Sequence, residues 1–83
     1  MNKIMVEIFV PMAGRSFEAF LPSHLAGYEA LGLIVKIAMD LTGGLFIANE
    51  ETVLCRGEDG AILSLNQPVC KMGLQNGDKL LLI

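Results

Sequence analysis

Hydrophobic and polar residues alternate along two stretches near the start of the chain, residues 4–11 and 16–22. Alternation predicts β-strands with one buried face, because successive side chains of a strand point to opposite sides. The expected core positions are Val6, Ile8, Val10, Phe17, Ala19 and Leu21. The opposite, outer side carries Met5, Glu7, Phe9, Ser16, Glu18 and Phe20. Residues 12–15 contain a glycine and predict a hairpin turn between the two strands.

From Gly27 or Tyr28 onward, the apolar residues recur every three or four positions, which predicts an amphipathic helix. Its apolar stripe consists of Leu31, Ile34, Val35, Ala38 and either Leu41 or Thr42. Ser23 is a candidate cap if the helix begins earlier. Gly43 and Gly44 predict the end of the helix, because glycine favours the left-handed conformation found there. Gly32 within the helix is expected to allow close approach to the sheet.

The following residues divide into shorter segments. Residues 45–51 predict a loop, and residues 52–56 and 61–65 predict two short strands joined by a turn at 57–60. Pro68 disfavours a central strand, so its surroundings predict a short 3₁₀ helix or a compact loop.

The segment Asn76-Gly77-Asp78 predicts a turn, with the Asp78 carboxylate accepting hydrogen bonds from turn amides. Residues 79–83 after it predict a final strand, apolar at every position from Leu80 onward. Such a strand belongs in the middle of a sheet, because an edge would leave it exposed. We therefore expect it beside the first strand and parallel to it, with the helix packed across. The predicted fold class is α+β, a mixed-sheet β-grasp in a single domain spanning residues 1–83.

Composition excludes several classes of function. The chain has 83 residues, of which 53% are hydrophobic, and a formal net charge of −3. A domain this small cannot bury so much apolar material, so an apolar surface for a protein partner is expected. Without clustered lysine and arginine, nucleic acid is excluded as a partner. The absence of a leader-like segment or a long apolar span predicts a cytoplasmic protein without membrane insertion.

Few side chains suit catalysis or metal binding. Cys55 and Cys70 are interpreted as buried or half-buried free thiols of a reducing compartment. His24 could join them at a zinc site or form a Cys–His nucleophile pair, but the spacing supports neither arrangement. No catalytic carboxylate pair, Ser-His-Asp set or phosphate-binding loop is found in the sequence. The sequence therefore predicts no cofactor, no metal and no enzymatic activity.

Several of these segments together resemble a known family. They are the hairpin, the helix ending in Gly43-Gly44, the segment 56–63, and Met72-Gly73-Leu74-Gln75-Asn76-Gly77-Asp78-Lys79-Leu80. This combination resembles the ubiquitin superfamily, and more narrowly the bacterial YukD-like family. Members of that family accompany type VII (ESX/WXG-type) secretion systems of Gram-positive bacteria. The resemblance implies a non-catalytic adaptor or regulatory protein that binds secretion machinery or a second copy of itself.

Two alternatives remain within the same fold. Protein modifiers and sulfur carriers resemble this chain but need a flexible C-terminal Gly-Gly. Gly43-Gly44 is instead interpreted as a helix end, and the last strand is expected to reach Ile83. The carrier alternative is therefore disfavoured. The second alternative is a small β-grasp subunit of a multicomponent enzyme, such as a monooxygenase.

The resemblance also implies where a partner binds. In ubiquitin-like domains the outer sheet face, together with an apolar residue of the first turn, is the usual recognition surface. The corresponding side chains here are Phe9, Met12, Phe20, Leu81 and Ile83. These residues are the predicted protein-binding site.

Overall fold

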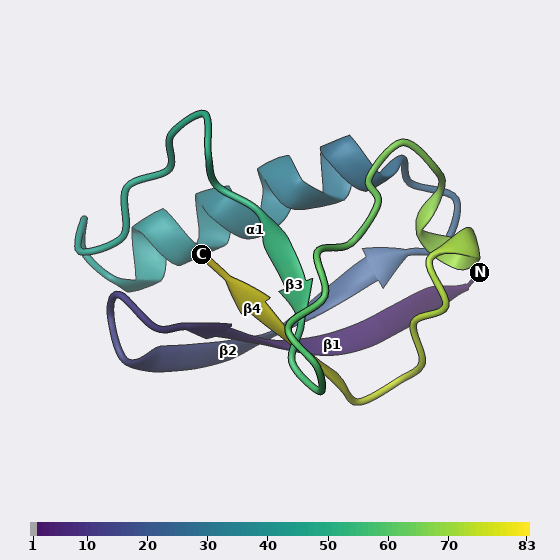
Figure 1. Cartoon of the computed structure of the whole chain (residues 1–83), viewed down its shortest axis with the longest axis horizontal. Coiled ribbons are helices and arrows are strands. Elements are labelled where there is room, and N and C mark those ends of the chain that lie inside the picture. Colours follow the sequence, from purple (N-terminus) through teal and green to yellow (C-terminus); the bar gives the residue numbers. More distant parts are fainter. Residues whose placement is uncertain (1) are drawn as a thin grey trace.

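The structure, a computed structural model, describes residues 2–83. Two strands form a hairpin, a helix follows, and the second half contributes two further strands and a short 3₁₀ helix (Figure 1). In chain order the elements are β1 (Lys3–Val10), β2 (Arg15–Pro22), α1 (Gly27–Leu41), β3 (Leu54–Arg56), η1 (Val69–Lys71) and β4 (Asp78–Leu82).

The first two strands confirm the alternation seen in the sequence. β1 and β2 pair in antiparallel fashion, and their register runs from Lys3 opposite Pro22 to Val10 opposite Arg15. The turn occupies residues 11–14, where Gly14 has a φ of +62°. Only glycine adopts this angle without steric cost, so the turn has the residue that its geometry requires.

Helix α1 begins at Gly27, and the candidate cap at Ser23 is wrong. Ala26 is the N-cap residue, and its amide donates a hydrogen bond of 3.2 Å to the Glu29 carboxylate. A Cβ atom at Gly27 would lie 2.5 Å from the carbonyl oxygen of Leu65. The start of the helix is therefore held by close backbone packing against a distant segment of the chain.

The helix ends as predicted, with positive φ angles at Gly43 and Gly44. Of the two candidates for the last position of the apolar stripe, Thr42 is buried and Leu41 is exposed. The Thr42 hydroxyl accepts a hydrogen bond of 3.1 Å from the amide of Phe46. The Phe46 side chain is fully buried, so the predicted loop after the helix contributes a large core residue.

The predicted strand at residues 61–65 is wrong. Within it only Ile62 forms a β-bridge, opposite Cys55 of β3. The Arg56 amide donates to the Ala61 carbonyl at 2.8 Å, and the Leu63 amide donates to the Leu54 carbonyl at 2.9 Å. The chain then leaves β3 for the start of α1, so pairing ends after a single bridge. The 3₁₀ helix η1 confirms the prediction for the segment around Pro68.

The final strand lies inside the sheet, as its composition predicts. The strand order is β2-β1-β4-β3, with β4 parallel to β1 and antiparallel to β3. The turn before β4 is bonded to β1, since the Met5 amide donates to Asn76 Oδ1 at 2.9 Å and the Gly77 amide donates to the Met5 carbonyl at 2.8 Å. Asp78 also confirms its predicted role, because its carboxylate accepts from the Gln75 amide at 2.9 Å.

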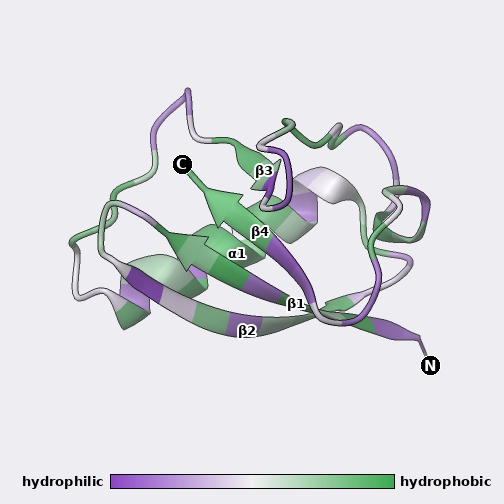
Figure 2. Ribbon diagram, turned by 60° about the horizontal axis from the view of Figure 1, so that its bottom comes forward, coloured by the Kyte–Doolittle hydropathy of each residue, from purple (hydrophilic) through white to green (hydrophobic). Residues whose placement is uncertain are grey.

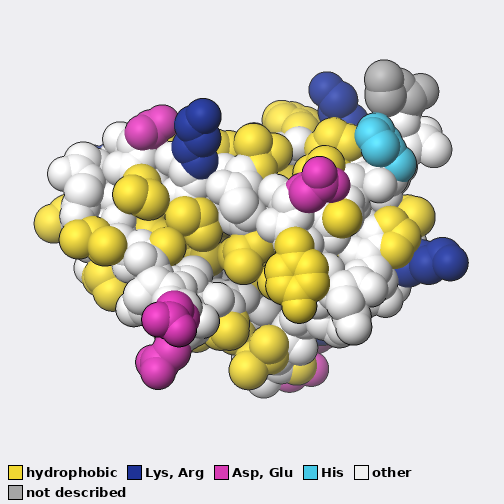
Figure 3. Space-filling model, turned by 90° about the horizontal axis from the view of Figure 1, so that it is seen from above, with side chains coloured by type: hydrophobic (Ala, Val, Ile, Leu, Met, Phe, Trp, Pro, Cys, Tyr) yellow, Lys and Arg dark blue, Asp and Glu magenta, His cyan; other side chains and the backbone are white. Residues whose placement is uncertain are grey.

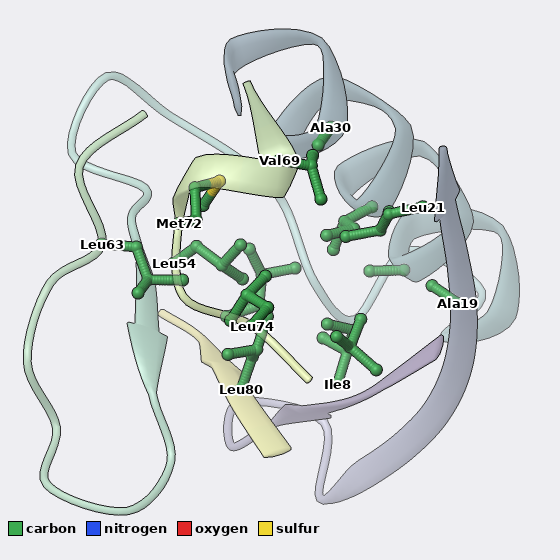
Figure 4. Close-up of a cluster of buried hydrophobic side chains, with 14 of the residues drawn as sticks. Ile8, Ala19, Leu21, Ala30, Leu54, Leu63, Val69, Met72, Leu74 and Leu80 are labelled. Atoms are coloured by element: carbon green, nitrogen blue, oxygen red, sulfur yellow. The ribbon is translucent and has the colours of Figure 1, made fainter. Parts of the chain in front are cut away.

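The core fills the space between α1 and the inner face of the sheet (Figure 4). Side chains from every element meet there, and those of β4 stand at its centre beside β1. The fully buried large residues are Phe46, Ile8, Leu21, Ile34, Leu54, Leu80, Leu82, Val6, Val10 and Val69. The mixed four-stranded sheet with one helix across it is a ubiquitin-like β-grasp fold of the α+β class.

We predict that Leu80→Ala lowers the free energy of unfolding by about 2–5 kcal/mol, because it removes contacts and leaves a cavity. Leu45→Ala is the matched control, since Leu45 is exposed and its truncation should change stability by less than about 0.5 kcal/mol. Urea unfolding followed by circular dichroism measures both. Equal losses in the two variants would contradict the central position of β4.

Candidate functional site

The outer face of the sheet, opposite α1, is built from aligned side chains of neighbouring strands. Phe9 of β1 is in register with Ser16 of β2 and with Leu81 of β4. Leu81 is in register with Cys55 of β3, and Ile62 stands opposite Cys55. We call these five residues the Phe9 row. Four of the five are apolar: Phe9 and Ile62 are exposed, Leu81 is half-buried and Cys55 is buried.

Charged residues form the next row. Glu7 of β1 is in register with Glu18 of β2 on one side and with Lys79 of β4 on the other. We call these three residues the Glu7 row. Beyond it, Met5 is in register with Phe20, and this pair is the Met5 row. Figure 2 shows the hydropathy along each strand: β4 is hydrophobic along most of its length, whereas hydrophilic residues interrupt β1 and β2.

A hollow of about 640 Å³ lies over this face, lined by members of the Phe9 and Glu7 rows and by the end of β3. Gly57 forms part of its wall and donates its amide hydrogen to the Lys79 carbonyl at 2.8 Å. A Cβ atom at Gly57 would lie 2.8 Å from that same oxygen. A residue without a side chain is therefore needed where the chain after β3 closes against β4.

The five residues predicted for protein binding occupy four places in the structure. Phe9 and Leu81 are adjacent in the Phe9 row, and both line the hollow. Phe20 is 60% exposed, but the Glu7 row separates it from Phe9. Met12 is exposed in the hairpin turn, and Ile83 is exposed beyond the end of β4. The Ile83 amide and carbonyl are both hydrogen-bonded to Val53, at 3.0 and 2.9 Å.

Sequence reasoning missed Ile62 and the pairing of Glu7 with Glu18. Ile62 is 68% exposed and extends the Phe9 row beyond β3, yet it lies in a segment that is not a strand. The alternation of each strand placed both glutamates on the outer face. Their pairing follows from the register of the hairpin, which the length of the turn at residues 11–14 sets.

A second hollow, of about 630 Å³, lies on the helical side of the molecule, between α1 and residues 48–50, 52–53 and 63–66. Gly32 lines it, and a Cβ atom there would have no neighbour within 4 Å. The expectation that Gly32 allows close approach to the sheet is therefore wrong, because its open side faces this hollow. Figure 3 shows hydrophobic side chains spread over the helical side, with charged side chains scattered among them.

The side chains considered for catalysis or metal binding are those of the two cysteines and His24. Cys55 is buried, whereas Cys70 is exposed, so the expectation of two buried or half-buried thiols is wrong for Cys70. His24 is exposed in the connector between β2 and α1. In residues 2–83 no three histidine, cysteine or acidic side chains gather where a metal ion could be held. Within the same residues, no helix combines the length and the apolar character needed to cross a membrane.

No protein-family model matches this chain, and no curated protein matches it in sequence. Comparison with solved structures does find similar folds. Protomer 1 of the ESX-3 core complex is similar over 99% of this chain, with 26% sequence identity and a TM-score of 0.73. The match covers 16% of that much longer chain.

Two further structures are similar over nearly their whole length. The ubiquitin-like domain of the type VII secretion system protein EccD1 from Mycobacterium tuberculosis has 18% identity and a TM-score of 0.66, covering 100% of this chain and 99% of that one. The ubiquitin of Caldiarchaeum subterraneum has 17% identity and a TM-score of 0.68, covering 99% and 92%. The structural neighbours are thus ubiquitin-like domains, among them domains of type VII secretion proteins.

We predict that Gly57→Ala lowers the free energy of unfolding by about 1–3 kcal/mol, because the added methyl group overlaps the Lys79 carbonyl. Gly32→Ala is the matched control and should raise stability by about 0.5–1 kcal/mol, since alanine favours the helix and its methyl group meets no neighbour. Chemical unfolding of both variants measures the difference. A tolerated Gly57→Ala would contradict the close approach of this segment to β4.

Proposed function

We propose that this chain is a non-catalytic, ubiquitin-like adaptor of a bacterial type VII secretion system. It would belong to the YukD-like family and act in the cytoplasm as a single domain spanning residues 1–83. Its partner would be a component of the secretion machinery, bound through the outer face of the sheet.

The observation that carries this proposal is the likeness to ubiquitin-like domains of secretion proteins. EccD1 of Mycobacterium tuberculosis is named as a type VII secretion system protein, and the ESX-3 protomer is part of a core complex. Both likenesses extend over essentially all of this chain. The closing motif from Met72 to Leu80, which resembles that of YukD-like proteins, also supports this proposal.

The choice of the outer face rests on exposed apolar side chains arranged without a covering element. Among the described residues, the only α-helix lies on the opposite side of the sheet (Figure 1). Phe9 is 39% exposed although it lies in the second strand from the edge, beside the half-buried Leu81. Large apolar side chains held on a rigid sheet lose little conformational entropy on binding, which favours their use as anchors.

The experiment is a secretion assay in cells from which the natural gene has been deleted. Export of WXG-type substrates into the medium should be lost and should return with the wild-type gene. We predict that the Phe9→Ser, Leu81→Ser double variant fails to restore export while accumulating as a folded protein. Leu45→Ser is the matched control, because Leu45 is also apolar and is more exposed than Phe9 and Leu81, but lies in the loop after α1.

Site-specific crosslinking identifies the partner in the same cells. A photoreactive residue at position 81 should join the chain to a type VII secretion component, whereas one at position 45 should not. Normal export in the deletion strain would refute the secretion role. An ATP-dependent covalent adduct on the chain, detected by mass spectrometry, would instead support a modifier or sulfur carrier.

A further inference from the structure

The rows of the outer face alternate between apolar and acidic character. The Glu7 row separates the apolar Phe9 row from the apolar Met5 row, and each row is offset by two residues along β1. Two residues of a strand span roughly 7 Å, so the three rows are spaced about 7 Å apart. A partner that covers this face must therefore complement three successive rows, of which the outer two are apolar and the middle one is acidic.

The Glu7 row holds an unfavourable pair of charges. Glu7 and Glu18 are directly opposite each other in an antiparallel pair, where Cβ atoms lie about 5 Å apart and like charges are destabilising. Lys79 is in register with Glu7 on the side away from Glu18. The single cation of the row therefore lies beside Glu7, and Glu18 has no cation in register with it.

Among residues 2–83, no cationic residue lies next to Glu18 on the outer face. Along β2 its neighbours on this face are Ser16 and Phe20, and β2 is an edge strand with no strand beyond it. Arg15 is close in sequence, but its guanidinium donates a hydrogen bond of 2.9 Å to the Leu41 carbonyl at the end of α1. That interaction directs the arginine to the helical side, so the charge of Glu18 remains open to a partner.

We propose that the outer face binds an extended protein segment in which a lysine or arginine side chain is flanked on both sides by apolar side chains. Its sequence pattern would be apolar-x-basic-x-apolar. The cation lies between Glu7 and Glu18, and the apolar residues contact Phe9 and Leu81 on one side and Met5 and Phe20 on the other. Alternate side chains of an extended segment are also about 7 Å apart, which matches the spacing of the rows.

The proposal rests on the proposed use of the outer face and adds the chemistry of the partner. A cation from the partner would relieve the repulsion within the Glu7 row. A neutral or acidic segment would instead bury the two carboxylates without compensating their charge, which makes binding less favourable. Removing one carboxylate should accordingly stabilise the free protein against unfolding and lower its affinity for the partner. If Glu18 had a purely structural role, its removal would change stability and affinity in the same direction.

The probe is a phage-displayed library of random 12-residue peptides, selected on the immobilised full chain and depleted on the Phe9→Ser variant. The expected result is enrichment of peptides with a basic residue between apolar residues at the stated spacing. Enrichment of neutral or acidic patterns, or no enrichment, would overturn the proposal. Peptides that lack a basic residue but need Phe9 for binding would support the outer face as the binding surface. They would refute only the inferred basic residue of the partner.

We predict that Glu18→Gln lowers the affinity for the best selected peptide by about fivefold or more and reduces the salt dependence of that affinity. In the free protein the same substitution should raise the melting temperature by about 1–5 °C, since it removes a like-charge pair. Glu51→Gln is the matched control, because Glu51 is an exposed glutamate outside both hollows, and it should change neither quantity.

Titration calorimetry and thermal unfolding measure these two effects. A lower melting temperature for Glu18→Gln, or unchanged peptide affinity, would contradict the proposal. Sedimentation of the free protein tests the remaining occupant of this face. A dimer at micromolar concentration that Phe9→Ser dissociates would replace the basic segment with a second copy of the chain.

Discussion

The parallel pairing of β4 with β1, inside a sheet that β3 completes on the other side, organises this molecule. Leu80 and Leu82 point from β4 into the core and are fully buried, so the strand supplies burial and hydrogen bonding at once. Parallel strands cannot be joined by a tight turn. The 67 residues between Val10 and Asp78, more than half of them after α1, bring the chain back to place β4 beside β1. The bonds from Met5 to Asn76 and Gly77 then set where the pairing starts.

The same pairing builds the outer face. A shift of β4 by one residue along β1 would send Leu80 and Leu82 outward, so burial of these two side chains enforces the register. That register places Leu81 beside Phe9 and Lys79 beside Glu7. The chemistry of the surface is therefore a direct consequence of core packing on the opposite side of the strand. The layout of the outer face is thus determined by the interior of the domain.

Much of the fold could be predicted because alternation, helical spacing and turn residues all agreed with the final structure. The strand predicted at residues 61–65 failed because apolar composition alone does not guarantee a partner strand, and only Ile62 finds one. Phe46 is the opposite case, because a residue of a predicted loop is buried in the core. Its burial depends on tertiary contacts, and its amide donates a hydrogen bond to the Thr42 hydroxyl, neither of which a local sequence pattern reveals. Phe9 and Leu81 could be assigned to the outer face from alternation, whereas the opposition of Glu7 and Glu18 required the hairpin register.

The central claim is that this protein acts by contact through the outer face of its sheet. Nuclear magnetic resonance of the isotopically labelled protein, titrated with the purified cytosolic part of its crosslinked secretion partner, tests that claim most directly. We expect the largest amide shift changes at Phe9, Glu18, Lys79 and Leu81. Changes confined instead to Tyr28, Gly32 and Val53, which line the hollow beside α1, would contradict it.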